Sequence, residues 1–172
     1  MKREDPLKIF VAGDSAGGNL SAAVSIAARD RNGPKLRGQI LIYPATNLSK
    51  FDTDSHNNFG KGFYLTERYM KKFREYYMPD QDLWTNIYAS PYLAKSLKNL
   101  PPAFILTAQF DVLRDEGEAY ARRLKSEGVL TIQTQYAGMI HGFLSMDGLF
   151  NQANHAFDEI AEFIKQTGNA NN

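Results

Sequence analysis

The 172-residue sequence contains no cysteine and no long apolar run. A fold without cysteine has no disulfide bonds, and such a composition fits a cytosolic protein. The longest apolar stretches, such as residues 39–43 and 103–108, are strand-length and far shorter than the roughly 20 residues of a membrane span. Residues 1–6 also lack the apolar segment of a secretory signal. We therefore expect a cytoplasmic protein with no membrane span.

The sequence also lacks an excess of charge of either sign. It has 20 Lys and Arg against 19 Asp and Glu, a formal net charge of +1, and its basic residues are scattered. Nucleic-acid-binding proteins usually gather basic residues on one face, so nucleic acid is not an expected partner. The hydrophobic share of 43% is ordinary for a globular protein, and we expect one domain over residues 1–172.

Strand-like and helix-like segments alternate along the chain. Runs of β-branched and aromatic residues predict four strands, at residues 7–12, 39–43, 103–108 and 130–136. Apolar residues at helical spacing predict helices at residues 19–29, 115–126 and about 153–164. This alternation predicts an α/β fold, with a mainly parallel sheet of about four strands and helices on both faces.

A polar segment separates the second predicted strand from the third. Thr66 is placed to be the N-cap of a helix within it, and Pro79 ends that helix. The aromatic and apolar residues at helical spacing are Tyr69, Met70, Phe73, Tyr76 and Tyr77. We expect this segment to be an excursion between two strands rather than a domain.

The turn after the first predicted strand has the pattern G-x-S-x-G centred on Ser15, and a predicted helix follows it. A tight strand-to-helix turn strains the serine backbone, and glycines avoid the clashes that β-carbons would cause there. We expect Ser15 to be a nucleophile and the Ala16 amide, at the helix N-terminus, to stabilise an oxyanion. The residues expected to form the surrounding nucleophile elbow are Gly13, Asp14, Gly17 and Gly18.

An alternative interpretation is a glycine-rich turn that binds phosphate or only connects two elements. The sequence has no G-K-[ST] and no G-x-G-x-x-G motif at this turn, which disfavours phosphate binding.

A serine hydroxyl needs a base, and the chain has three histidines. His141 lies just past the fourth predicted strand, and Gly138 and Gly142 flank it on a loop suited to catalysis. His56 lies in the polar excursion and His155 on or near the solvent side of the last helix, and we interpret both as structural. His141 is therefore the expected base.

The imidazole in turn needs a carboxylate that fixes its tautomer. Asp111 follows the third predicted strand, at the same sheet edge as Ser15 and His141. Asp115 is the competing candidate, but it begins a helix, where a favourable interaction with the helix dipole explains it without catalysis. We favour Asp111, and the chain order Ser, Asp, His is the one found in α/β-hydrolases.

Four segments together resemble the hormone-sensitive-lipase-like family of α/β-hydrolase carboxylesterases, over a region from about Lys8 to Ile164. They are residues 13–20 (GDSAGGNL), 88–91 (YASP), 111–117 (DVLRDEG) and 138–143 (GMIHGF). The resemblance implies hydrolysis of short or medium acyl esters through an acyl-enzyme, without a cofactor or metal. Ser15 would be the nucleophile, His141 the base and then the acid, and Asp111 its orienting carboxylate. The family commonly has Pro where Val112 stands, a change that leaves the carboxylate in place.

The sequence departs from the family in one further way. Its members carry an upstream His-Gly-Gly-Gly-type loop that supplies most of the oxyanion hole, and no such run occurs in these 172 residues. The resemblance therefore implies the C-terminal half of the fold, without the first strands, the cap or that loop. Two alternatives to an ester hydrolase follow: a catalytically silent fragment, and a subunit that interacts through an exposed sheet edge. We expect the chain to form homo-oligomers or to associate with a complementary N-terminal half.

Overall fold

The computed structural model describes residues 8–169, so residues 1–7, including the predicted strand start at Leu7, lie outside it. The sheet has four parallel strands in the order β1-β2-β3-β4. These are β1 (Ile9–Asp14), β2 (Leu36–Ile42), β3 (Ala103–Phe110) and β4 (Thr131–Ile140). The predicted α/β fold is confirmed. β4 is longer than predicted, ending at Ile140 rather than Tyr136, which places His141 directly after the strand.

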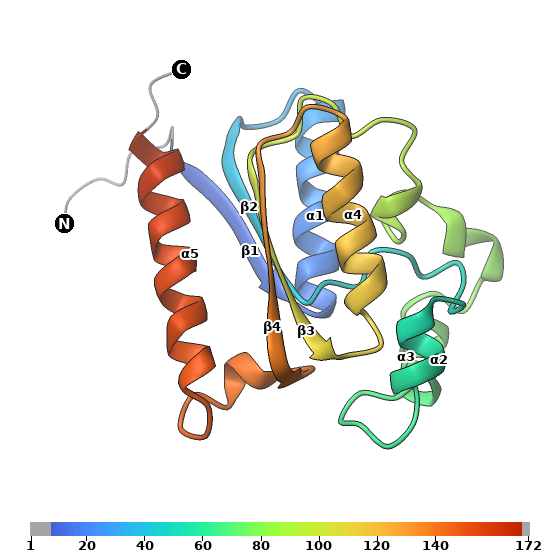
Figure 1. Ribbon diagram of the computed structural model, residues 1–172. Helices are drawn as coiled ribbons and strands as arrows, with labels where there is room; N and C mark the ends of the chain where they lie inside the picture. The colour runs from blue at the N-terminus through green and yellow to red at the C-terminus, as the bar shows by residue number, and fades with distance from the viewer. Residues whose placement is uncertain (1–7, 170–172) are drawn as a thin grey trace.

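Three long helices cover the two faces of the sheet (Figure 1). They are α1 (Ala16–Asp30), α4 (Arg114–Ser126) and α5 (Asn151–Asn169). Helices α1 and α4 lie together on one face and α5 lies on the other, as predicted. None of the helices within residues 8–169 is long and apolar enough to cross a membrane.

The core follows the two-residue alternation of the strands. On β2 and β3, Ile40 and Phe104 pack in the cluster that includes Phe163 of α5. Their neighbours Leu41 and Ile105 pack in the cluster that includes residues of α1 and α4. Each such side chain contributes about 1.5–3 kcal/mol when fully buried, so the two clusters hold the helices against the sheet.

The excursion between β2 and β3 contains short elements. They are α2 (Asp54–Phe59), α3 (Glu67–Tyr77) and the 3₁₀ turns η1 (Gln81–Thr85) and η2 (Pro91–Leu93). A third apolar cluster, which includes Leu48, Met70 and Leu113, anchors the excursion to the residues after β3. Thr66 is the N-cap of α3, as predicted, and its Oγ1 accepts a hydrogen bond from the Tyr69 amide.

The aromatic residues of α3 are not a buried stripe. Met70 is 5% exposed, whereas Tyr69, Phe73, Tyr76 and Tyr77 are each more than half exposed. Only one face of this short helix packs inward, the face that carries Met70 and Arg74. Cζ of Arg74 lies over the ring of Trp84, 3.4 Å from its centroid. The helix therefore leaves an aromatic surface uncovered within the described residues.

Candidate active site

Ser15 joins β1 to α1 in a strained backbone conformation, with φ 55° and ψ −115°. Such angles are costly for a residue with a side chain and persist only where the surroundings enforce them. The Ser15 amide donates to the Ile42 carbonyl (2.8 Å), and its own carbonyl accepts from the amides of Asn19 (3.1 Å) and Ala45 (3.3 Å). These bonds hold Ser15 at the carboxyl end of the sheet, partly exposed.

The glycines of this turn differ in how much space a Cβ atom would have. A Cβ on Gly13 would collide with the backbone of Gly17, and one on Gly18 would lie 2.8 Å from Cβ of Pro44. A Cβ on Gly17 would meet nothing closer than Oδ1 of Asp14, at 3.9 Å. The expected clash therefore holds for Gly13 and Gly18 and is wrong for Gly17. Asp14 ends β1 with an exposed side chain.

Ala16 is the first residue of α1. The amides of the first helical turn have no carbonyl acceptor within the helix, and the positive end of the helix dipole lies at the same point. The Ala16 amide, next to Ser15 in the chain, therefore stays the candidate donor to an oxyanion.

His141 follows β4 and is 6% exposed. Its Nε2 lies 2.9 Å from Oγ of Ser15. The ring also packs against Tyr43, with the ring centroids 4.7 Å apart. Tyr43 was not singled out from the sequence, although its place directly after β2 puts it at the same sheet edge. Burial, with Asp14 and Asp111 nearby, raises the pKa of its hydroxyl, so it stays neutral.

Asp111 is 1% exposed, and its Oδ2 lies 2.7 Å from Nδ1 of His141. Its Oδ1 accepts a hydrogen bond from the Leu113 amide at 2.9 Å. A carboxylate in this position places the imidazole proton on Nδ1 and leaves the Nε2 lone pair toward Ser15. The structure therefore brings Ser15, His141 and Asp111 into one hydrogen-bonded series.

The competing residues have other partners. Asp115 accepts from the Ser55 amide and from Nε of Arg114. Nδ1 of His155 on α5 lies 3.2 Å from the Tyr136 hydroxyl, and the residue is exposed. His56 is 1% exposed, and its Nδ1 lies 2.7 Å from Oγ1 of Thr53.

A pocket of about 420 Å³ adjoins Ser15. Its other walls come from α1, the segment after β2 and α3, and the lining residues are Ala16, Asn19, Leu20, Ala45, Leu48, Met70, Phe73, Arg74 and Tyr77. Most of these side chains are apolar. Sequence reasoning did not assign the α3 residues to a pocket, because helical spacing shows which residues share a face but not what that face meets.

The residues described by the structure include no group of three or more His, Asp or Glu side chains that could hold a metal ion.

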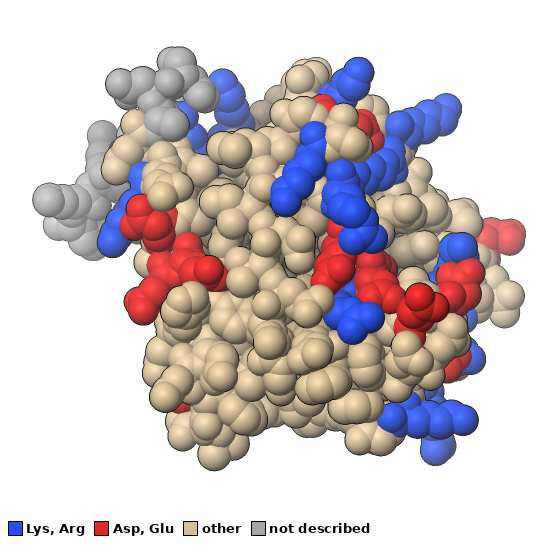
Figure 2. Space-filling view, viewed as in Figure 1, with Lys and Arg blue, Asp and Glu red and all other residues tan. Residues whose placement is uncertain are grey.

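In the space-filling view, the surface around the carboxyl end of β4 carries few charged side chains (Figure 2).

A family model described as the alpha/beta hydrolase fold matches residues 2–145. Among curated proteins, the chain is 44% identical over 147 residues to the carboxylic ester hydrolase LipN of Mycobacterium tuberculosis, covering 82% of this chain and 39% of that protein. It is 41% identical over 142 residues to an arylesterase of Saccharolobus solfataricus, covering 81% of this chain and 45% of that protein. The chain thus spans less than half the length of both relatives.

Two solved structures show the same relationship. The thermostable carboxylesterase EstE1, from a metagenomic library, superposes with a TM-score of 0.93 at 39% identity, covering 96% of this chain and 57% of that one. The hyperthermophilic esterase of Pyrobaculum calidifontis superposes with a TM-score of 0.91 at 43% identity, covering 96% and 53%. The resemblance to hormone-sensitive-lipase-like carboxylesterases is thereby confirmed, and the chain belongs to the α/β-hydrolase fold family.

Proposed function

We propose that this chain carries the hydrolytic centre of a carboxylic ester hydrolase. The observation that carries the proposal is the series from Asp111 through His141 to Ser15, with contacts of 2.7 and 2.9 Å. The ester-hydrolase names of the relatives support the same reaction class.

In the proposed reaction, Oγ of Ser15 attacks the ester carbonyl carbon while its proton passes to Nε2 of His141. The carbonyl oxygen becomes an oxyanion, and the Ala16 amide donates a hydrogen bond to it. The bond between carbon and alcohol oxygen then breaks, and His141 returns its proton to the leaving alcohol. Asp111 remains ionised and stabilises the imidazolium.

The resulting acyl-enzyme on Ser15 is removed by water in the same way. His141 takes a proton from the water as it attacks the acyl carbon, and Ser15 leaves with that proton as a free hydroxyl. These proposed steps use only the three side chains, the Ala16 amide and water. The pocket volume of about 420 Å³ and its apolar walls suit a short or medium acyl ester.

One amide is a weak oxyanion hole. Losing one donor typically slows a serine hydrolase about 10²- to 10³-fold. The 172 residues contain no His-Gly-Gly-Gly run, so we expect slow turnover when the chain acts alone. The missing donors would come from a polypeptide segment equivalent to the remaining part of the longer relatives.

A second candidate function is assembly through the surface beside the site. Within the described residues β1 pairs with β2 alone, so one of its edges faces no strand. Leu20 and Val24, one helical turn apart on α1, are 51% and 47% exposed. We propose that this surface receives a complementary N-terminal half or a second copy of the chain.

The test is hydrolysis of p-nitrophenyl acetate and butyrate by the purified chain, with labelling by a fluorophosphonate probe. Ser15→Ala should abolish both signals, and Ser126→Ala, at an exposed serine on α4, is the matched control. Labelling of Ser15 without measurable turnover would favour the silent-fragment alternative. A folded wild-type chain that neither labels nor hydrolyses either ester would refute the proposed centre.

A further inference from the structure

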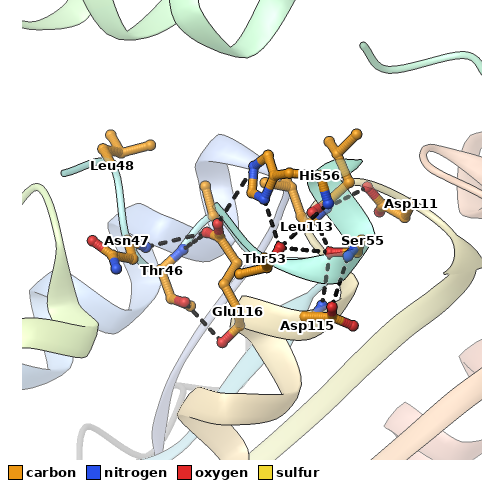
Figure 3. A network of polar contacts seen from close by, with 12 residues as sticks. Thr46, Asn47, Leu48, Thr53, Ser55, His56, Asp111, Leu113, Asp115 and Glu116 are labelled. Atoms are coloured by element: carbon orange, nitrogen blue, oxygen red, sulfur yellow. Dashed lines mark hydrogen bonds and ion pairs between the residues drawn. The ribbon is translucent and has the colours of Figure 1, made fainter. Parts of the chain in front are cut away.

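A buried pair of titratable side chains lies behind the proposed triad and takes no part in it. His56 of α2 is 1% exposed and Glu116 of α4 is 4% exposed. Nε2 of His56 lies 4.0 Å from Oε2 of Glu116 (Figure 3). Nε2 has no hydrogen-bond partner. A buried polar atom without a partner is rare enough to need an explanation.

The hydrogen bonds around His56 determine which of its nitrogens carries a proton. Oγ of Ser55 donates its proton to the Val112 carbonyl (2.7 Å). The hydroxyls of Ser55 and Thr53 lie 3.0 Å apart, so Thr53 is the donor in the hydrogen bond between them. We assign this proton of Thr53 to Ser55, an assignment that makes Nδ1 of His56 the donor in the 2.7 Å contact with Oγ1 of Thr53. In neutral His56, Nε2 then carries the lone pair that faces Glu116.

The other oxygen of Glu116 is already engaged. Oε1 accepts hydrogen bonds from the amides of Thr46 (2.6 Å) and Asn47 (3.1 Å) (Figure 3). Oε2 is left facing the lone pair of Nε2, and an ionised oxygen there would be repelled. A proton on the Glu116 carboxyl group removes this repulsion without a hydrogen bond across the 4.0 Å gap.

The environment favours a neutral pair with that proton on Glu116. Burial raises the pKa of Glu116 to about 8, and the nearby Asp111 acts in the same direction, while the two amide donors oppose it. Burial lowers the pKa of His56, against the raising effect of the carboxylates around it, which are Glu67, Asp111, Asp115 and Asp52. Protonated Glu116 and neutral His56 are therefore the state near neutral pH.

Glu116 is connected to the pocket beside Ser15 by the backbone that it holds. Thr46 and Asn47 stand between Ala45 and Leu48, which both line the pocket. The Thr46 hydroxyl also donates to the Glu116 carbonyl (3.0 Å), and the Ala45 amide donates to the Ser15 carbonyl (3.3 Å). Movement at Glu116 would thus move one wall of the substrate pocket.

We propose that Glu116 is a positioning residue for the substrate pocket, which fixes the segment from Ala45 to Leu48 while its carboxyl group stays protonated beside His56. This inference rests on the proposed esterase function for its kinetic consequence. Loss of the proton leaves a buried carboxylate facing the Nε2 lone pair and Asp111. The repulsion displaces the Glu116 side chain from the amides of Thr46 and Asn47, so the segment loosens. The effect falls on substrate binding rather than on the chemical step.

The kinetic experiment compares Glu116→Gln and Glu116→Ala with wild type across the pH range. Glutamine keeps a carbonyl oxygen for the two amides and offers an N-H to His56, so it imitates the protonated acid. Glu116→Gln should match the wild-type KM near neutral pH and lack the rise in KM that we expect of wild type above about pH 8. Glu116→Ala should raise KM roughly tenfold at every pH with little change in kcat, since two hydrogen bonds to the segment are lost.

The control is Glu118→Ala, on the same helix, whose carboxylate bonds to Gln135 and pairs with Arg122 outside this cluster. It should leave KM and its pH profile unchanged. Equal KM values in Glu116→Ala and wild type would overturn the positioning role. An alkaline rise in KM that persists in Glu116→Gln would overturn the role given to the Glu116 proton.

A second measurement needs no ester turnover and so separates this proposal from the proposed function. Carbon-13 NMR of the Glu116 carboxyl should titrate near pH 8, and hydrogen exchange at Thr46 and Asn47 should accelerate above that pH relative to Glu116→Gln. A Glu116 carboxyl that titrates in the ordinary range of glutamate would refute the protonated state of Glu116 whether or not the chain hydrolyses esters.

Discussion

Nε2 of His141 lies 2.9 Å from Oγ of Ser15, although 126 residues separate them in the chain and their strands are the two outer members of the sheet. Three strand spacings amount to about 14 Å, so the histidine has to reach back across the carboxyl edge. Gly138 and Gly142, with φ of 77° and 81°, allow the backbone on either side of His141 to make this turn. Asp111, directly after the intervening β3, then contacts Nδ1 of His141 through its Oδ2.

This arrangement predicts that Asp111→Asn lowers kcat far more than the small change in side-chain size suggests. The asparagine amide would donate to Nδ1 and leave the proton of His141 on Nε2, where it cannot accept from Ser15. The measured kcat on an activated short-chain ester should fall by about 10⁴-fold, to the level of the Ser15→Ala blank. Asp115→Asn is the control, because its carboxylate contacts Ser55 and Arg114 instead. An equal loss of kcat in both variants would argue against the assignment of Asp111.

The elbow predicts unequal effects of alanine at two glycines of one motif. Gly13→Ala should lower the free energy of unfolding by about 1–3 kcal/mol, because its Cβ would collide with the backbone of Gly17. Gly17→Ala should cost much less, since its Cβ has 3.9 Å of clearance. Urea denaturation of the two variants measures the difference. Equal destabilisation would mean that the turn is not held as tightly as its hydrogen bonds indicate.

The sequence was enough to predict the strands and the three residues that the structure brings together. Each of these residues follows a recognisable strand, and parallel pairing sends all such positions to one edge. Ser15 also lies in the G-x-S-x-G motif. The competing candidate Asp115 lies at the start of a helix, a position that accounts for a carboxylate without a catalytic role.

The excursion between β2 and β3 could not be predicted in the same way. The helical spacing of α3 was correct, but the exposure of Phe73 and Tyr77 depends on which elements lie beside that helix. The pairing of His56 with Glu116 joins residues from two distant elements without any motif. Such a contact is determined by how α2 packs on α4, which local sequence does not encode.

The buried acid predicts a pH dependence of stability with a definite sign. The pKa of Glu116 is about 8 in the folded chain and near 4.5 when unfolded, so the folded state holds the proton over a range in which the unfolded chain has lost it. The stabilisation from this group is complete below about pH 4.5 and is lost as the pH rises through about 8. His56, with its lowered pKa, acts in the opposite direction at lower pH.

Comparison with Glu116→Gln isolates the contribution of the acid, because His56 is present in both proteins. The free energy of unfolding of wild type, minus that of the variant, should decrease from about pH 5 to about pH 8. Urea titrations at intervals across this range give the difference directly. A difference that stays constant with pH would show that Glu116 does not retain its proton in the fold.

The free edge of β1 predicts that the chain associates. An unpaired strand presents a row of amide and carbonyl groups that can pair with another chain, and such edges are normally protected by charge, proline, a bulge or a covering segment. β1 carries Ile9, Phe10 and Val11, and within the described residues Lys8 is the charge that precedes them. Leu20 and Val24 of α1, the helix that follows β1, add exposed apolar surface.

We therefore expect the purified chain to form dimers or larger species that dissociate on dilution, as measured by size-exclusion chromatography with light scattering. Ile9→Lys should weaken this association, because a charge on the strand disfavours a second chain at that edge. Ile132→Lys is the matched control, since Ile132 lies on the opposite outer strand with nearly the same exposure, 39% against 38%. If Ile132→Lys disrupts the assembly and Ile9→Lys does not, β4 rather than β1 is the interface. A monomer at every concentration, with one cooperative unfolding transition, would show that the β1 edge is protected and that association is not needed to cover it.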